Sequence, residues 1–228
     1  MANRAYLRLW TRDFSATTLL EQFVRFLALA PLPERDPYFE RLTIQPIEAS
    51  LAPIAEWELR GQQFGAAEVA ALAAQHLNGD TSYNVAASWD LWQFDIEKLQ
   101  WAMQPAPLLL SCHGPDYDGG IEESDGPFAA DLGFEDLFTG HAGLLAKSSG
   151  NLLELPPASQ DPAEHTFRRW MAVEANLRQY HQKTRENIQR LTNWMEDIPR
   201  ALPVERQELY SEGEENFEAR LDEILAVR

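Results

Sequence analysis

The chain has 228 residues, 45% of them hydrophobic and 11% aromatic, a composition typical of a globular protein and not of a disordered one. Its net charge of −17 argues against binding to nucleic acid or to an anionic membrane. No stretch is apolar over the ~18 residues that a membrane span needs, and the N-terminus lacks the pattern of a secretory signal. The single cysteine excludes an internal disulfide. We therefore expect a soluble, cytoplasmic protein.

The first half of the chain alternates between strand-like and helix-like patterns. Trp57 and Leu59 alternate with charged side chains, which is the two-residue period of a half-buried strand. Residues 18–27 place apolar side chains at steps of three and four, which is the period of a helix. The expected elements are a strand over 5–10, a helix up to residue 30, strands over 42–47 and 54–60, a helix over 66–77, and strands over 83–94 and 101–112.

This order, β-α-β-β-α-β-β, predicts an α+β fold with a ferredoxin-like split-βαβ sheet and helices on one face. Pro46 lies inside the second strand, which indicates an edge position or a bulge because proline cannot donate a backbone hydrogen bond. Around Trp89, large apolar side chains project from both faces of one strand. We expect the C-terminal helix to cover the face that carries Trp92 and Phe94; an open face would be an acidic-aromatic hot spot for a protein partner.

The C-terminal part is expected to be a helical segment, residues 156–228, packed on a sheet domain of residues 1–155. A capping residue, Asp161, and a proline at the first helical position predict the start of a long helix. Pro199 is expected to end this helix. The remaining expected elements are a loop over 114–126, short elements near 134–138 and 142–146, and shorter helices over 204–210 and 214–227.

An apolar stripe runs along the long C-terminal helix from Trp170 to Ile198 at steps of three and four residues. It predicts packing of this helix against the sheet domain. The alternative is pairing with a partner helix in a structural or oligomerisation protein. The chain is accordingly expected to be a monomer or a homodimer.

Acidic residues are concentrated in the middle of the chain. Between residues 61 and 146 one lysine faces thirteen Asp and Glu, a net charge of −12 (1 − 13). Such a surface attracts a basic partner and raises the rate of encounter, or it serves solubility alone. We hypothesise a non-catalytic module that binds a basic protein, as an immunity protein does when it neutralises a basic toxin or nuclease. The residues expected to bind this partner are Trp92, Asp116, Asp118, Glu122, Glu123 and Asp125.

The alternative is a metal-dependent or cysteine hydrolase that uses the 111–141 region. Cys112 and His113 could serve as nucleophile and base, but neighbours on a strand point to opposite faces, so we expect a buried, inert thiol. His113, Asp116, Asp118 and His141 have the nitrogen and oxygen donors that bind Zn, Mn or Fe. The sequence has no HExxH, CxxC, EF-hand or glycine-rich phosphate motif. We therefore expect no cofactor and, on balance, no enzyme.

Overall fold

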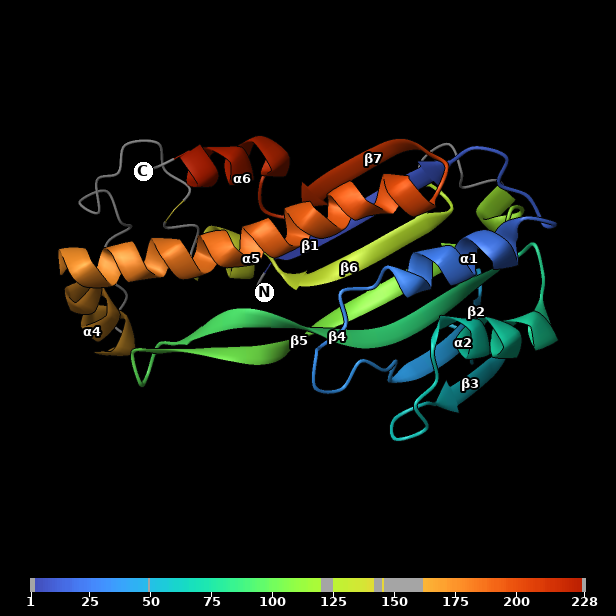
Figure 1. Ribbon diagram of the computed structural model, residues 1–228, viewed down its shortest axis with the longest axis horizontal. Coiled ribbons are helices and arrows are strands. Elements are labelled where there is room, and N and C mark those ends of the chain that lie inside the picture. Colours follow the sequence, from blue (N-terminus) through green and yellow to red (C-terminus); the bar gives the residue numbers. More distant parts are fainter. Residues whose placement is uncertain (1–2, 49, 120–124, 142–144, 146–161, 227–228) are drawn as a thin grey trace.

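The computed structural model describes residues 3–48, 50–119, 125–141, 145 and 162–226 of the chain. Within them, seven strands form one antiparallel sheet with the order β3-β2-β4-β5-β6-β1-β7 (Figure 1). The strands are β1 (Arg4–Thr11), β2 (Arg41–Pro46), β3 (Ala55–Glu58), β4 (Thr81–Asp95), β5 (Gln100–His113), β6 (Phe128–Phe134) and β7 (Val204–Ser211). The α-helices are α1 (Leu19–Ala28), α2 (Ala66–Ala73), α3 (Asp136–Thr139), α4 (Pro162–Met171), α5 (Glu174–Ala201) and α6 (Phe217–Ala226), with 3₁₀ turns η1 (Ala74–His76) and η2 (Tyr117–Gly119).

The α+β class is confirmed, but the ferredoxin-like strand order is wrong. A split-βαβ sheet would bring the strands of the two βαβ units together. Here β1 pairs with β6 and β7, whereas β2 pairs with β3 and β4. Three strands, β4, β5 and β6, therefore lie between β1 and β2. The error has a physical cause, because β6 and β7 were not predicted as strands and they take both edges of β1.

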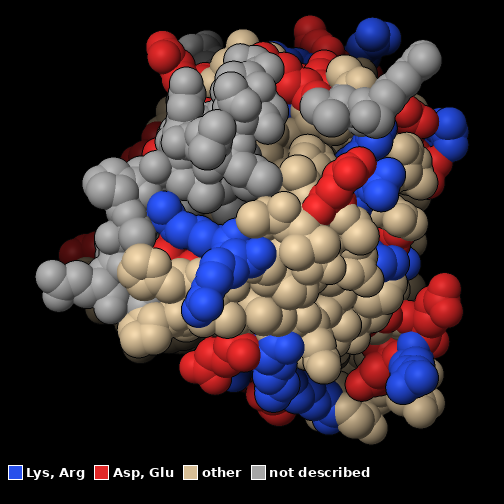
Figure 2. Space-filling view, turned by 90° about the vertical axis from the view of Figure 1, so that its left-hand side faces the viewer, with Lys and Arg blue, Asp and Glu red and all other residues tan. Residues whose placement is uncertain are grey.

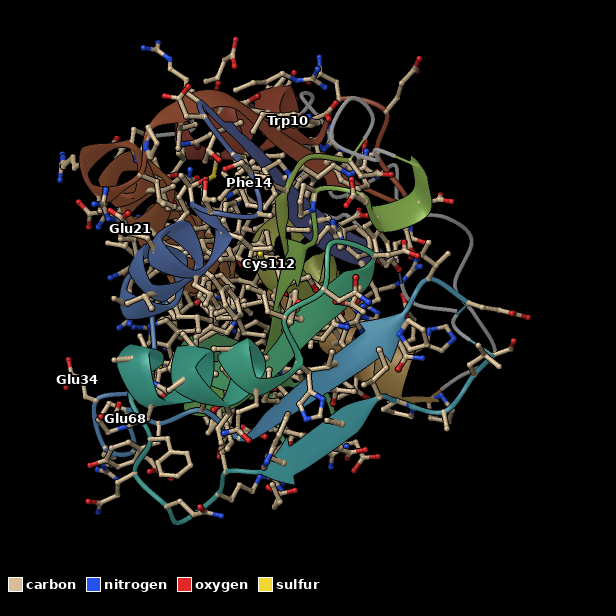
Figure 3. The ribbon with its side chains drawn as sticks, turned by 90° about the vertical axis from the view of Figure 1, so that its right-hand side faces the viewer. Trp10, Phe14, Glu21, Glu34, Glu68 and Cys112 are labelled. Atoms are coloured by element: carbon tan, nitrogen blue, oxygen red, sulfur yellow. The ribbon has the colours of Figure 1, made fainter. Side chains whose placement is uncertain are left out.

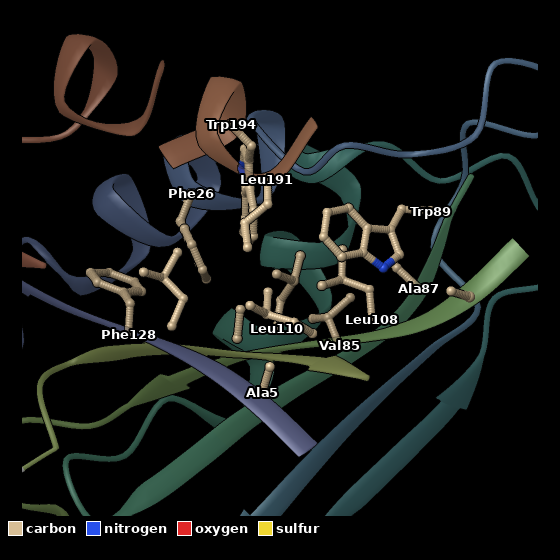
Figure 4. Close-up of a cluster of buried hydrophobic side chains, with 14 of the residues drawn as sticks. Ala5, Phe26, Val85, Ala87, Trp89, Leu108, Leu110, Phe128, Leu191 and Trp194 are labelled. Carbon is tan, nitrogen blue, oxygen red and sulfur yellow. The ribbon is translucent and has the colours of Figure 1, made fainter. Parts of the chain in front are cut away.

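Figure 1 shows α1, α2 and α5 lying across the same face of the sheet. Alternate residues of the strands point into this layer and are buried, as in β1, where Ala5, Leu7 and Leu9 are inaccessible to solvent. Figure 4 shows Trp194 of α5 between Phe26 of α1 and Trp89 of β4. Its ring lies 6.2 Å from that of Trp89 and 6.3 Å from that of Phe26. Full burial of a large apolar side chain such as Phe26 contributes roughly 1.5–3 kcal/mol to the stability of the fold.

Strands β4 and β5 extend beyond the rest of the sheet as a long hairpin, which we call the arm. β2 pairs with β4 only as far as Ala86, and β6 pairs with β5 only from Leu109, so no strand of the described residues pairs with either outer edge of the arm. Helix α5 covers the edge of β4 through Asn187, which is fully buried. Its amide accepts a hydrogen bond from the backbone N–H of Trp92 at 2.8 Å and donates to the carbonyls of Trp92 at 2.8 Å and Leu137 at 2.9 Å.

The C-terminal helices cover the aromatic face of the arm, as predicted. Phe94 packs against Phe167 and Trp170 of α4 and Tyr180 of α5, at ring distances of 5.5, 4.8 and 5.2 Å. The apolar stripe is also largely used within the chain, since Tyr180, Ile188, Leu191 and Ile198 are buried. Intramolecular packing of this helix is therefore confirmed.

The predicted long helix is interrupted between α4 and α5, where Val173 takes an extended conformation. The break lets α4 turn back so that its aromatic side chains reach the arm. At the other end, Pro199 does not stop α5, which continues to Ala201. Proline cannot donate to the carbonyl four residues earlier, but Gln207 of β7 donates its side-chain amide to that Met195 carbonyl at 3.2 Å.

Two further expectations fail. The 204–210 stretch is not a helix but the edge strand β7, and β6 occupies residues 128–134, for which no strand was predicted. Pro46 lies at the end of β2, beyond the last residue that β3 pairs, so its missing N–H falls at a local edge as expected. The proposed boundary between residues 155 and 156, the 142–146 element apart from Leu145, and the Asp161 cap lie outside the described residues.

Candidate functional site

Three loops meet at one end of the sheet, the end opposite to the arm (Figure 3). The loop after β2 begins beside Thr81, because Pro46 pairs with that residue. The loop after β5 joins them, since Gly114 donates its N–H to the Thr81 carbonyl at 2.8 Å and Asp116 donates to the Gly79 carbonyl at 2.7 Å. We call these loops, residues 47–54 (without residue 49), 77–80 and 114–119, the acidic end.

Glycines allow two of these loops to lie backbone to backbone. A Cβ atom on Gly114 would collide with the carbonyl of Gly79, and one on Gly79 would collide with the carboxyl of Asp116. Only a residue without a side chain permits so close an approach. The two loops are therefore held in fixed relative positions, and with them their acidic side chains.

The acidic end presents unneutralised negative charge. Its acids Glu48, Asp80, Asp116 and Asp118 are all exposed, and its loops contain no lysine or arginine. Within the described part of the chain, no ion pair joins any of these four carboxylates to a basic side chain. Most of the acidic side chains on the neighbouring strands, by contrast, form ion pairs with basic side chains.

Asp125, one of the predicted partner-binding residues, illustrates the difference. It forms an ion pair with Arg8 of β1 at 2.6 Å, and Asp131 of β6 likewise pairs with Arg4 at 2.8 Å. The negative charge of each of these two acids is therefore offset by an arginine of the same chain. Glu122 and Glu123, also predicted to bind the partner, lie outside the described residues.

Exposed apolar side chains accompany the acids. Ile47, Leu51, Ile54 and Leu77 are 37–53% exposed, and they are four of the seven large apolar side chains that are exposed in the described part of the chain. An apolar centre with a polar rim is typical of a protein-binding surface. The sequence prediction missed these four residues, although large apolar side chains in loops were a visible signal.

His113 and Cys112 lie at the base of the acidic end but face opposite sides of β5. The ring of His113 stacks on Tyr117 at 5.0 Å and its Nδ1 lies 3.2 Å from the Gly126 carbonyl oxygen. Burial lowers the pKa of His113, which favours the neutral ring. Cys112 is fully buried among core residues, and burial raises the pKa of its thiol. The geometry gives a cysteine hydrolase no thiolate and no paired base.

The four predicted metal ligands do not converge. His113, Asp116 and Asp118 lie at the acidic end, whereas His141 follows α3 at the far end of β6. The seven residues of β6 put roughly 23 Å between the two places. Among the residues that the structure describes, no three His, Cys, Asp or Glu side chains form a group that could hold a metal ion.

Trp92 is also separated from the predicted acidic partners. It lies ten residues along β4 from Ser82, the residue paired with His113, which corresponds to roughly 33 Å. The ammonium group of Lys183 lies 3.7 Å from the centre of its ring. The acidic end and the Trp92 region are therefore two distinct surfaces.

Comparison with models of protein families, with curated protein sequences and with solved structures found no match to this chain. In the described part of the chain, no helix combines the length and the hydrophobicity that crossing a membrane requires.

Proposed function

We propose that this protein is a non-catalytic module that binds a basic protein through the acidic end. The observation that carries the proposal is the coincidence of four carboxylates, none with a basic partner among the described residues, with four exposed apolar side chains on three adjoining loops. The carboxylates steer a basic partner toward this end. The apolar side chains contribute binding energy once the surfaces touch.

An immunity-type neutraliser of a basic toxin or nuclease is the role that fits these properties. Such a partner has a cationic cleft, which an acidic surface with exposed apolar side chains complements in both charge and polarity. The net charge of −17 supports this assignment, since it disfavours binding of the same surface to nucleic acid.

The test is affinity capture from the native host's lysate with three versions of the protein. The first is the wild type, and the second carries Asp80→Lys, Asp116→Lys and Asp118→Lys. The third is a control of equal charge change at exposed acids elsewhere, Glu97→Lys, Glu218→Lys and Asp222→Lys. Captures are run at about 50 and about 500 mM salt, between which the screening length falls from about 14 Å to about 4 Å.

The proposal expects one basic protein, in stoichiometric amount, with the wild type and the control at both salt concentrations. The triple acidic-end variant should lose it. A partner that all three versions capture equally, or one that the control also loses, would contradict binding through the acidic end.

A further inference from the structure

A pocket of about 170 Å³ lies at the other end of the molecule, the end that Figure 2 views. It is formed between the arm, α3 and α5. Its lining is mainly aromatic, with one acid and no lysine or arginine: Trp92, Gln93, Phe94, Ile96, Trp101, Phe134, Asp136, Leu137, His141 and Tyr180. Cavities of about 150 Å³ hold a ligand the size of benzene, so the pocket suits a small group.

Three rings form a tightly packed aromatic wall. The centres of Phe94 and Trp101 are 5.1 Å apart, those of Trp101 and Tyr180 are 4.9 Å apart, and those of Phe94 and Tyr180 are 5.2 Å apart. The face of an aromatic ring carries partial negative charge and attracts cations. These three rings have no cation of their own chain over them among the described residues.

Rings at the border of the pocket already bind cations. Lys183 lies over Trp92 at 3.7 Å, and the guanidinium of Arg4 lies over Phe134 at 5.4 Å. Aromatic faces in this region are thus accessible to ammonium and guanidinium groups.

Asp136 supplies a full negative charge beside the wall. No lysine or arginine in the described part of the chain pairs with it. The His141 imidazole lies near Asp136, but its Nε2 is 3.2 Å from Glu164 Oε2, so it is already engaged with another acid. Desolvation by the surrounding protein raises the pKa of Asp136, although the side chain is still exposed to solvent.

We propose that this pocket binds a small organic cation of the alkylammonium class, with the cationic group between the aromatic wall and the Asp136 carboxylate. Such a cation is either a free molecule or a lysine-type side chain of a polypeptide. The proposal is independent of the acidic end, which lies at the opposite end of the sheet.

The experiment compares two ligands of the same shape. Choline carries a quaternary ammonium, and 3,3-dimethyl-1-butanol replaces the nitrogen with carbon and is uncharged. Binding is measured by titration with tryptophan fluorescence and by calorimetry, on the wild type, on Asp136→Asn and on Asp222→Asn, an exposed acid of α6 that serves as the control. Circular dichroism verifies that each variant is folded.

Choline should bind saturably, and the neutral ligand should bind more weakly by about 2- to 30-fold, the factor that corresponds to a cation–π energy of about 0.5–2 kcal/mol. Asp136→Asn should weaken choline binding while Asp222→Asn leaves it unchanged. A peptide with trimethyllysine that binds more tightly than choline would identify a polypeptide as the source of the cation, and tighter binding of choline would identify a free molecule.

Equal binding of choline and 3,3-dimethyl-1-butanol would overturn the proposal, because the pocket would then recognise shape alone. Unchanged choline binding by Asp136→Asn, or no saturation by about 100 mM choline, where the binding free energy is only about 1.4 kcal/mol, would overturn it as well.

Discussion

Replacing Asn187 with leucine tests how α5 is attached to the arm. The side chain is fully buried and makes three hydrogen bonds, one from the Trp92 N–H and two to the carbonyls of Trp92 and Leu137. Leucine has the same number and branching of side-chain heavy atoms but no polar atoms, so the change removes the hydrogen-bond partner without leaving a large cavity. A buried polar group that loses its partner costs about 1–3 kcal/mol, and three such groups give a loss of at least about 3 kcal/mol.

The loss is large against the total stability of a domain, about 5–15 kcal/mol. It is measured by urea unfolding, followed through tryptophan fluorescence, with Asn193→Leu as the matched control. Asn193 lies on the same helix but is exposed, and its side chain bonds only to that of Gln189 in the described structure. The control should change stability by less than about 0.5 kcal/mol.

The urea concentration at the midpoint of unfolding should be lower for Asn187→Leu than for the wild type, while the slope of the unfolding free energy against urea concentration stays the same. Equal effects of the two substitutions, or a loss below about 1 kcal/mol in Asn187→Leu, would refute the reasoning, because three unsatisfied buried groups cannot cost so little. Either result would mean that α5 does not hold the arm through this amide.

Two other predictions concern stability. Burial lowers the pKa of His113 below the ~6.5 of an unfolded chain, so the contribution of the neutral ring to stability is complete above pH ~6.5 and is lost as the pH falls below that value. The substitution His113→Gln should therefore reduce the drop in unfolding free energy between about pH 7.5 and pH 5. The control His165→Gln, at an exposed position, should not reduce it. Gln207→Leu should lower the free energy of unfolding by about 1 kcal/mol, because it leaves the Met195 carbonyl without a donor. The loss should be smaller in a Pro199→Ala background, because the alanine N–H can then donate to that carbonyl within the helix. Equal losses in both backgrounds of a double-mutant cycle would contradict this coupling.

Local sequence patterns were sufficient to predict the strands and helices whose apolar residues are clearly patterned. Strands β1 and β3 follow from alternation, β4 and β5 follow from their apolar and aromatic residues, and α1 follows from helical spacing. Coverage of Phe94 by the C-terminal helices also followed, since exposed patches of that size are rare. The inert state of Cys112 followed from its position next to His113 on a strand.

The sequence by itself determined which residues are apolar, which are charged and where most strands and helices begin. Only the tertiary structure decided the strand order, the break before α5, the passage of α5 through Pro199, and the identity of β7 as a strand. These features depend on partners distant in the chain, such as Gln207 for Met195 and β1 for β7. The same holds for the two sites. The acids of the acidic end and the rings around Asp136 are each dispersed in the sequence, and backbone pairing across the sheet brings them together.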